Sequence, residues 1–219
     1  LPEYQNQYGG RKGPNFEFST GDGTVTNDGQ GVNWGDKLNV GTEKKQFHSP
    51  IDAETGERIP IPWVAYPNNV KNFFEIGSIF SNNLSLSGRS ENIGYRFTVT
   101  QMNQKGVVPN TDLERINISS NINAKIGKRV NLSTNFNFSK SGSSNLPSNG
   151  YSRSLMYNFL WFYRNVPISA VRSYWLPGQE NVAQRNFETK WVNNVYFTAY
   201  ENRNSFDKYR GYGTLKLDY

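Results

Sequence analysis

The chain has 219 residues, a formal net charge of +6, one histidine and no cysteine. The lack of cysteine excludes disulfide frameworks, thiolate metal sites and thiol nucleophiles, and the lone His48 argues against Ser-His-Asp chemistry and histidine-based metal centres. The chain also has 29 Asn, 14 Phe, 13 Tyr and 5 Trp, and this mixture of amides and aromatics does not suit an ordinary soluble core.

The first 77 residues show little periodicity. Residues 15–19 predict a strand tip, whereas the glycine-rich residues 21–35 and the proline-rich residues 49–67 predict loops. The first residues lack the basic and apolar regions of a signal peptide, and no run reaches the ~18–20 apolar residues of a membrane-spanning helix. We therefore expect residues 1–77 to form a barrel strand tip and a long loop.

Residues 78–140 alternate between apolar and polar side chains. Between Ile116 and Ile126 one face is mostly isoleucine, while the positions between carry Asn, Ser and Lys. Strict period two is typical of strands whose two faces meet different surroundings. Short turns at residues 88–92 and 127–129 and a mid-length loop at residues 103–114 separate the alternating segments. The region therefore predicts two β-hairpins of a barrel wall.

Residues 141–209 predict a long extracellular loop, and residues 210–219 alternate again and predict a returning barrel strand. A short helix is expected near 151–164. Three apolar residues recur there near helical spacing: Leu155, Phe159 and Phe162. Pro167 then ends the helical pattern.

Short and long connections alternate along the predicted strands. This asymmetry is typical of outer-membrane barrels, which have short turns at one end and long loops at the other. The amide-rich strand faces suit water, and the nearly uncharged apolar faces suit lipid. We expect an all-β protein, an antiparallel transmembrane β-barrel segment of about five or six strands. Strand alternation also fits a soluble all-β carbohydrate-binding or adhesin module, which is the alternative.

Five aromatic residues of the predicted long loop are candidates for contact with a ligand or a partner: Trp161, Tyr163, Tyr174, Trp175 and Trp191. Flat amphipathic rings can stack on sugars or meet another protein. The same rings can instead pack the loop against itself, because an ordered loop of this length needs a small core.

No other side chains indicate chemistry. Acidic residues gather in two loops: Asp22 and Asp28 in the first, and Asp52, Glu54 and Glu57 in the second. Neither group has EF-hand spacing, and turn formation accounts for both. No carboxylate pair suggests catalysis, His48 is interpreted as a surface residue, and the scattered cations do not form a nucleic-acid stripe. We expect no enzyme activity, no catalytic residue, no cofactor, no metal and no nucleic-acid partner.

Several motifs together resemble one family. In order along the chain they are NVKNFFEIG at 69–77, NNLSLSG at 82–88, YR at 95–96 and QKGVVPNTDLER at 104–115. Their order and spacing resemble the early barrel of SusC/RagA-type TonB-dependent transporters. Supporting matches are WGDKL at 34–38, RNVPI at 164–168 and WVNNVY at 191–196. The resemblance covers roughly residues 34–219.

The resemblance implies an outer-membrane barrel of Bacteroidota that imports large nutrients, oligosaccharides or peptides, driven by TonB and capped by a SusD-like surface lipoprotein. Such barrels are 22-stranded, and the family's plug domain and TonB box are absent from this chain. We therefore expect a segment of a larger polypeptide in the bacterial outer membrane. Its expected partners are the lipoprotein, TonB through that plug, the rest of the barrel and the substrate.

Overall fold

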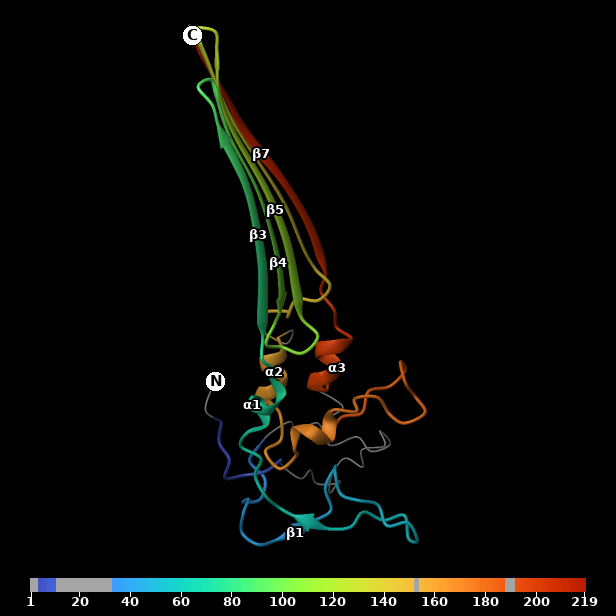
Figure 1. The fold of residues 1–219 in the computed structure, drawn as a ribbon. Coiled ribbons are helices and arrows are strands. Elements are labelled where there is room, and N and C mark those ends of the chain that lie inside the picture. The colour runs from blue at the N-terminus through green and yellow to red at the C-terminus, as the bar shows by residue number, and fades with distance from the viewer. Residues whose placement is uncertain (1–3, 11–32, 152–153, 188–191) are drawn as a thin grey trace. The chain divides into compact units, whose positions relative to one another are not determined.

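The structure is a computed structural model that describes residues 4–10, 33–151, 154–187 and 192–219. Strand predominates over helix, 41% against 11%, so the chain is mostly β. It divides into two compact units (Figure 1). The loop unit comprises Leu1–Glu75 with Pro147–Arg203, and the sheet unit comprises Ile76–Leu146 with Asn204–Tyr219.

The sheet unit is built from five antiparallel strands that pair in chain order. They are β3 (Ser78–Arg89), β4 (Ile93–Lys105), β5 (Asp112–Ile126), β6 (Val130–Ser143) and β7 (Phe206–Asp218). The strand register aligns the apolar positions of neighbouring strands on one face, as their alternation predicts. Within the described residues the sheet is open, because β3 and β7 each pair along one side only.

The strands extend further than their alternation predicts. β7 begins at Phe206 rather than at 210, and β6 continues to Ser143. The connection between β4 and β5 shrinks to residues 106–111. It is closed by the Gly106 amide, which donates to the Thr111 carbonyl at 2.9 Å, and by the Thr111 hydroxyl, which donates to the Val108 carbonyl at 2.6 Å. Backbone pairing therefore continues where side-chain alternation is lost.

The loop unit contains only short elements. They are β1 (Glu43–Lys44), β2 (Ile61–Pro62), α1 (Asn69–Phe73), α2 (Leu155–Leu160), the 3₁₀ helix η1 (Ile168–Val171) and α3 (Val195–Tyr200). α1 packs against η1, and α2 packs against α3. The strand tip expected at residues 15–19 lies outside the described residues.

Helix α2 is shorter than the helix expected near 151–164. The Ser154 hydroxyl accepts the Tyr157 amide at its start. At its end the Arg164 guanidinium donates to the Phe159 carbonyl at 3.1 Å, and the Phe162 amide donates to the same oxygen at 3.2 Å. These donors satisfy a terminal carbonyl of the helix, which ends after six residues.

The core of the loop unit is a chain of aromatic rings from separate segments. Phe73 of α1 meets Phe159 of α2 with ring centroids 5.1 Å apart, and Phe159 meets Phe162 at 5.9 Å. Phe162 meets Phe187 at 4.8 Å, and Phe187 meets Phe47 at 6.1 Å. All five rings are buried. The two stretches expected as separate loops thus share one hydrophobic core.

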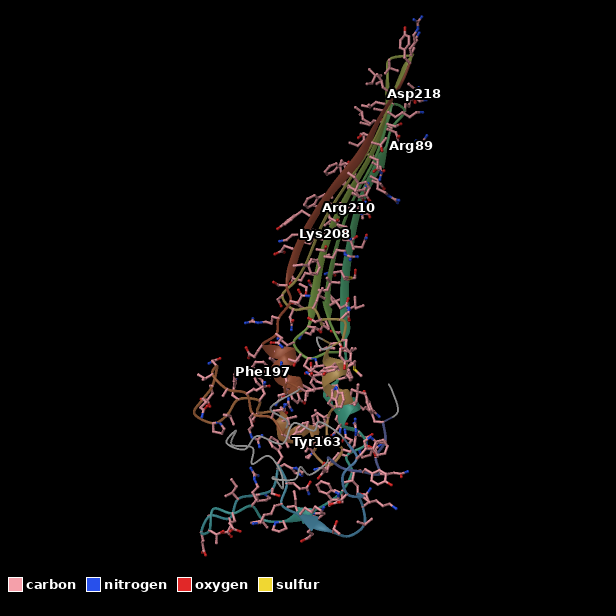
Figure 2. All side chains as sticks on the ribbon, turned by 180° about the vertical axis from the view of Figure 1, so that it is seen from behind. Arg89, Tyr163, Phe197, Lys208, Arg210 and Asp218 are labelled. Atoms are coloured by element: carbon pink, nitrogen blue, oxygen red, sulfur yellow. The ribbon has the colours of Figure 1, made fainter. Side chains whose placement is uncertain are left out.

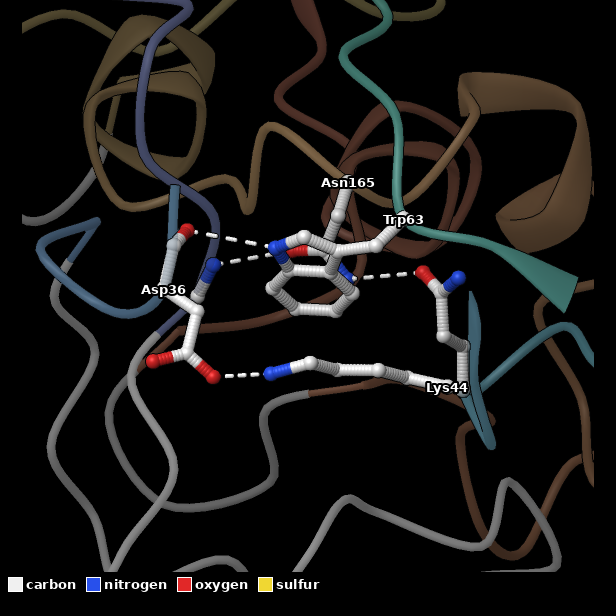
Figure 3. A network of polar contacts seen from close by, with 6 residues as sticks. Asp36, Lys44, Trp63 and Asn165 are labelled. Atoms are coloured by element: carbon white, nitrogen blue, oxygen red, sulfur yellow. Dashed lines mark hydrogen bonds and ion pairs between the residues drawn. The ribbon is translucent and has the colours of Figure 1, made fainter. Parts of the chain in front are cut away.

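Amide side chains connect the segments around this core (Figure 3). The Asn165 amide donates to the Gln46 side-chain oxygen at 3.1 Å and accepts from the Gly10 backbone at 2.8 Å. Close by, the Trp63 indole donates to the Asp36 carbonyl at 3.2 Å, and the Lys44 ammonium pairs with the Asp36 carboxylate. The buried Asn165 and Gln46 therefore have a structural role: Asn165 binds the Gly10 amide, and Gln46 donates to the carbonyls of Ile61 and Pro62.

Candidate functional site

The five candidate aromatic residues do not form one group. Tyr163 is buried, with its ring 4.7 Å from that of Phe187, so it belongs to the core. Trp161 is half-buried and lies 6.3 Å from Tyr157 between ring centroids. Trp191 lies outside the described residues. Only Tyr174 and Trp175 are brought together, with ring centroids 5.5 Å apart.

Tyr174 and Trp175 form an aromatic cluster with two residues of α3, Phe197 and Tyr200. The Tyr174 and Tyr200 rings stack at 5.9 Å and 20°, and Trp175 meets Phe197 edge to face at 5.3 Å and 88°. All four side chains are half-buried. The cluster therefore offers partly exposed ring surface at the outside of the loop unit.

A carboxylate completes the aromatic cluster. The Tyr174 hydroxyl donates to Glu201 Oε1 at 2.9 Å. Burial raises the pKa of the Tyr174 phenol, and the hydrogen bond to Glu201 and its negative charge raise that pKa further. The phenol thus stays protonated at neutral pH and holds the carboxylate in place beside the rings.

Asn194 positions the helix that carries half of the cluster. Its side-chain oxygen accepts the Tyr196 amide at 2.8 Å, which caps the start of α3. Its side-chain nitrogen donates to the carbonyls of Val171 at 2.8 Å and Arg185 at 2.7 Å. Sequence reasoning missed α3, because Val195–Tyr200 is mostly β-branched and aromatic and favours a strand; the asparagine before it, a preferred N-cap residue, was the available signal.

His48, expected at the surface from its loop position, is half-buried. Both ring nitrogens are buried, and neither has a hydrogen-bond partner in the described structure. Burial first, and then the nearby charges of Arg58 and Arg185, lower the pKa of His48 to about 4. The imidazole is therefore neutral at neutral pH, and its contact with Tyr66, at 5.9 Å between ring centroids, is a packing contact.

In the acidic loop that the structure describes, residues 52–57, a carboxylate stabilises the turn. The Asp52 carboxylate accepts the amides of Glu54 at 2.9 Å and Thr55 at 2.8 Å, which closes its own loop. These hydrogen bonds, led by those from Thr55, lower the pKa of Asp52. Asp22 and Asp28 lie outside the described residues. Within the described ranges, no three His, Asp or Glu side chains converge as metal ligands.

The apolar face of the sheet unit is the most unusual surface of the chain. We use this name for the side of β3–β7 on which Leu84, Val99, Ile118 and Phe138 share one cross-strand row. Many large side chains on this face are 38–75% exposed. They include Leu84, Leu86, Ile93, Phe97, Val99, Ile116, Ile118, Ile126, Phe136, Tyr209, Leu215 and Leu217. Soluble monomers rarely expose an apolar patch of this extent.

The apolar face has a defined height. On β5 it runs from Ile116 to Ile126, which at about 3.4 Å per residue is about 34 Å of strand. Tilted by 35–45°, that length spans about 24–28 Å, close to the ~25 Å apolar band of an outer-membrane barrel. The height of the apolar face therefore matches the thickness of a bilayer's apolar layer.

Tyrosines and cations lie at both ends of the apolar face. At one end the Lys140 ammonium lies 5.5 Å from the centre of the Tyr209 ring, in the same cross-strand row as Ile116. At the other end the Arg129 guanidinium donates to the Tyr219 hydroxyl at 3.4 Å. Paired aromatic and basic side chains at a boundary are typical of membrane interfaces.

The opposite side of the sheet, which we call the amide face, carries hydrogen-bonding side chains between strands. Asn83 donates to the Thr100 hydroxyl at 2.8 Å, and the hydroxyls of Ser85 and Thr98 lie 3.0 Å apart. Further along, Asn135 donates to Asn121, and Asn137 donates to Asn135. These groups need water or a polar ligand to satisfy their remaining donors and acceptors.

Comparison with known proteins adds no relative: neither the models of known protein families nor the curated proteins contain a match to this chain.

Among the described residues, no helix has the length and apolar character needed to cross a membrane.

Proposed function

We propose that the sheet unit is part of the wall of an outer-membrane transporter. The observation that carries the proposal is the difference between its two faces, one broadly apolar and exposed and the other rich in amides and hydroxyls. Moving a large apolar side chain out of water gains about 1.5–3 kcal/mol. A lipid environment would remove about a dozen apolar side chains of this face from water and so stabilise the sheet unit.

In this proposal β3 and β7 pair with further strands of the same barrel. Each has one edge without a partner in the described sheet, and unpaired backbone groups in lipid cost several kcal/mol apiece. The chain is then a segment of a larger, 22-stranded barrel, and the amide face lines its passage. The loop unit belongs to the extracellular side, and the protein resides in the bacterial outer membrane.

The resemblance of residues 69–115 to SusC/RagA-type proteins supports a TonB-dependent importer of oligosaccharides or peptides. A SusD-like lipoprotein is the proposed partner outside the barrel, and TonB acts through a plug that this chain does not contain. The wall itself performs no covalent chemistry in this proposal. Its contribution is passive, because it provides the passage while the plug moves.

The test is the intact mass of the native polypeptide that carries these residues, purified from source membranes in detergent with whatever accompanies it. We expect a mass several times 25.0 kDa and a co-purifying lipoprotein. A 25.0 kDa species that stays monodisperse without detergent overturns the proposal.

A soluble carbohydrate-binding or adhesin module is the second candidate. The aromatic cluster favours it, because Tyr174, Trp175, Phe197 and Tyr200 are half-exposed rings beside a carboxylate, as sugar sites often require. The same detergent experiment separates the two, since a soluble module needs none.

A further inference from the structure

The charges of the sheet unit are sorted by face. Within the five strands the amide face carries seven cations, and its single carboxylate is Asp218. The cations are Arg89, Arg96, Arg115, Lys125, Lys208, Arg210 and Lys216. All seven are exposed, and Figure 2 labels three of them, Arg89, Lys208 and Arg210, on the strands.

The apolar face has a different balance. Its strand positions hold two cations, Lys105 and Lys140, and three carboxylates, Asp112, Glu114 and Asp207. The chain has 24 cationic and 18 acidic residues, and the amide face holds seven of the cationic ones and one of the acidic ones. The rest of the chain therefore has 17 residues of each sign. The whole net charge of +6 therefore equals the charge of this one face.

Three of these cations, Arg115, Lys208 and Arg210, lie close enough to act together. Arg115 and Lys208 stand in one cross-strand row, two strands apart, which places their backbones about 10 Å from each other. Lys208 and Arg210 are two positions apart on β7, about 7 Å along the strand. These spacings approach the ~8 Å Debye length at physiological salt, so their potentials overlap. An anion meets the combined positive potential of these three cations there.

Neutral hydrogen-bonding groups occupy the space between the cations. Asn121 and Asn135 lie in the same cross-strand row as Arg96, and Thr100 lies in the row of Arg210. Side-chain amides and hydroxyls both donate and accept, as sugar hydroxyls do. A ligand that matches this face carries negative charges at intervals along a hydroxyl-rich backbone.

We propose that the amide face binds an acidic oligosaccharide, whose sugar rings carry carboxylate or sulfate groups. The proposal rests on the proposed function, in which this face lines the passage of a transporter, and it narrows the substrate class from oligosaccharides or peptides to anionic sugars. Charge complementarity attracts the chain of anionic groups, and the amide ladder between the cations binds the hydroxyls.

The experiment measures binding to the whole detergent-solubilised polypeptide by calorimetry. The probes are a galacturonate tetramer, its fully methyl-esterified neutral form and a tetraglutamate peptide. We expect the acidic sugar to bind about tenfold or more tightly than its ester at low salt, with affinity that falls as salt rises. The ester keeps the same sugar backbone, so the comparison isolates the charge.

Variants assign the binding to the amide face. Replacing Arg115, Lys208 and Arg210 together by glutamine should weaken binding of the acidic sugar about tenfold, because three attractive charges are removed from the face. The control replaces Lys105 and Lys140, on the apolar side, by glutamine and should change affinity less than about twofold. Far-UV circular dichroism checks that both variants keep the sheet.

Four outcomes overturn this inference: equal binding of acid and ester, no binding of either sugar, an unaffected triple variant, or tetraglutamate binding as tightly as the acidic sugar. These readouts are separate from the proposed function, which depends on detergent and mass. A detergent-dependent barrel that prefers the ester would retain the transporter and reject the acidic substrate.

Discussion

The two units of this chain bury their side chains in opposite ways. Apart from Pro109 in the connection between β4 and β5, the buried aliphatic and aromatic side chains of the described residues lie in the loop unit, where Phe159 is 0% exposed. The sheet unit has longer and more regular elements, yet many of its large apolar side chains are exposed, and Leu84 is 75% exposed. Regular backbone pairing and a hydrophobic core are thus separate properties, and each unit has mainly one of them.

The difference identifies what each unit needs. The loop unit can draw stability from its own interior, because its rings meet one another. The backbone of the sheet unit is hydrogen-bonded within the sheet. Its exposed apolar side chains, however, can be removed from water only by surroundings outside the unit. Substitutions that act on one property only can therefore test the comparison.

The largest effect is expected from truncating the aromatic core. Phe159→Ala removes a ring that contacts Phe73 and Phe162 and should destabilise the loop unit by about 3–5 kcal/mol. Leu160→Ala, at the next position of the same helix, is the matched control. Leu160 is 53% exposed, so its truncation should cost less than about 1 kcal/mol. Chemical denaturation followed by near-UV circular dichroism measures both, and equal losses would mean that the rings do not form a core.

A charge on the apolar face tests the sheet unit. Ile122 lies midway along the apolar stretch of β5, and Ile122→Arg should cost about 2–4 kcal/mol of membrane folding stability. Asn123→Arg, one residue on and facing the amide side, should cost close to nothing. The measurement is the fraction of polypeptide that is protected from protease after refolding into lipid vesicles. If both variants refold as the parent does, lipid is not what covers the apolar face.

The sheet could be predicted from sequence because its information is local. Alternation from Ile116 to Ile126 needs only a period of two, and the structure confirms that face. The core of the loop unit has no such period, since Phe47, Phe73, Phe159 and Phe187 come from distant segments. Its helices are also too short, at five or six residues, to display an amphipathic pattern.

The aromatic cluster could be predicted only in part, because its residues come from two separate segments. Tyr174 and Trp175 are neighbours in sequence, so their aromatic side chains alone make them candidates. Phe197 and Tyr200 join them through the placement of α3, which depends on the hydrogen bonds of the buried Asn194. Hydrogen bonds from one side chain to two carbonyls far away in the chain leave no pattern that a single sequence reveals.

Asn194 offers a third, intermediate test. Asn194→Ala removes the cap of α3 and leaves the Val171 and Arg185 carbonyls without this donor, so we expect a loss of about 2 kcal/mol. The change should also disturb the environment of Trp175, which fluorescence can follow. Asn193→Ala, at the exposed neighbouring position, is the control. An unchanged spectrum in Asn194→Ala would show that the cluster does not depend on this helix start.

The smallest expected effect is a pH dependence confined to the loop unit. The folded-state pKa of His48 is lowered to about 4 from 6.5, by burial and by the charges of Arg58 and Arg185. Between those values the unfolded chain binds a proton that the folded chain does not, so stability falls as pH drops from about 6.5 toward 4. Because the side chain is only partly buried, we expect about 1–2 kcal/mol from this residue.

The variant His48→Gln isolates that contribution, because it removes the titrating group and leaves every carboxylate in place. The difference in unfolding free energy between parent and variant should change by about 1–2 kcal/mol between pH 7 and pH 4.5 and stay level above pH 7. The sheet unit has no histidine, so Ile122→Arg should leave this pH difference unchanged. A difference that does not vary with pH would mean that the imidazole meets water in the folded state, and the contrast between the two units would then be weaker at this position.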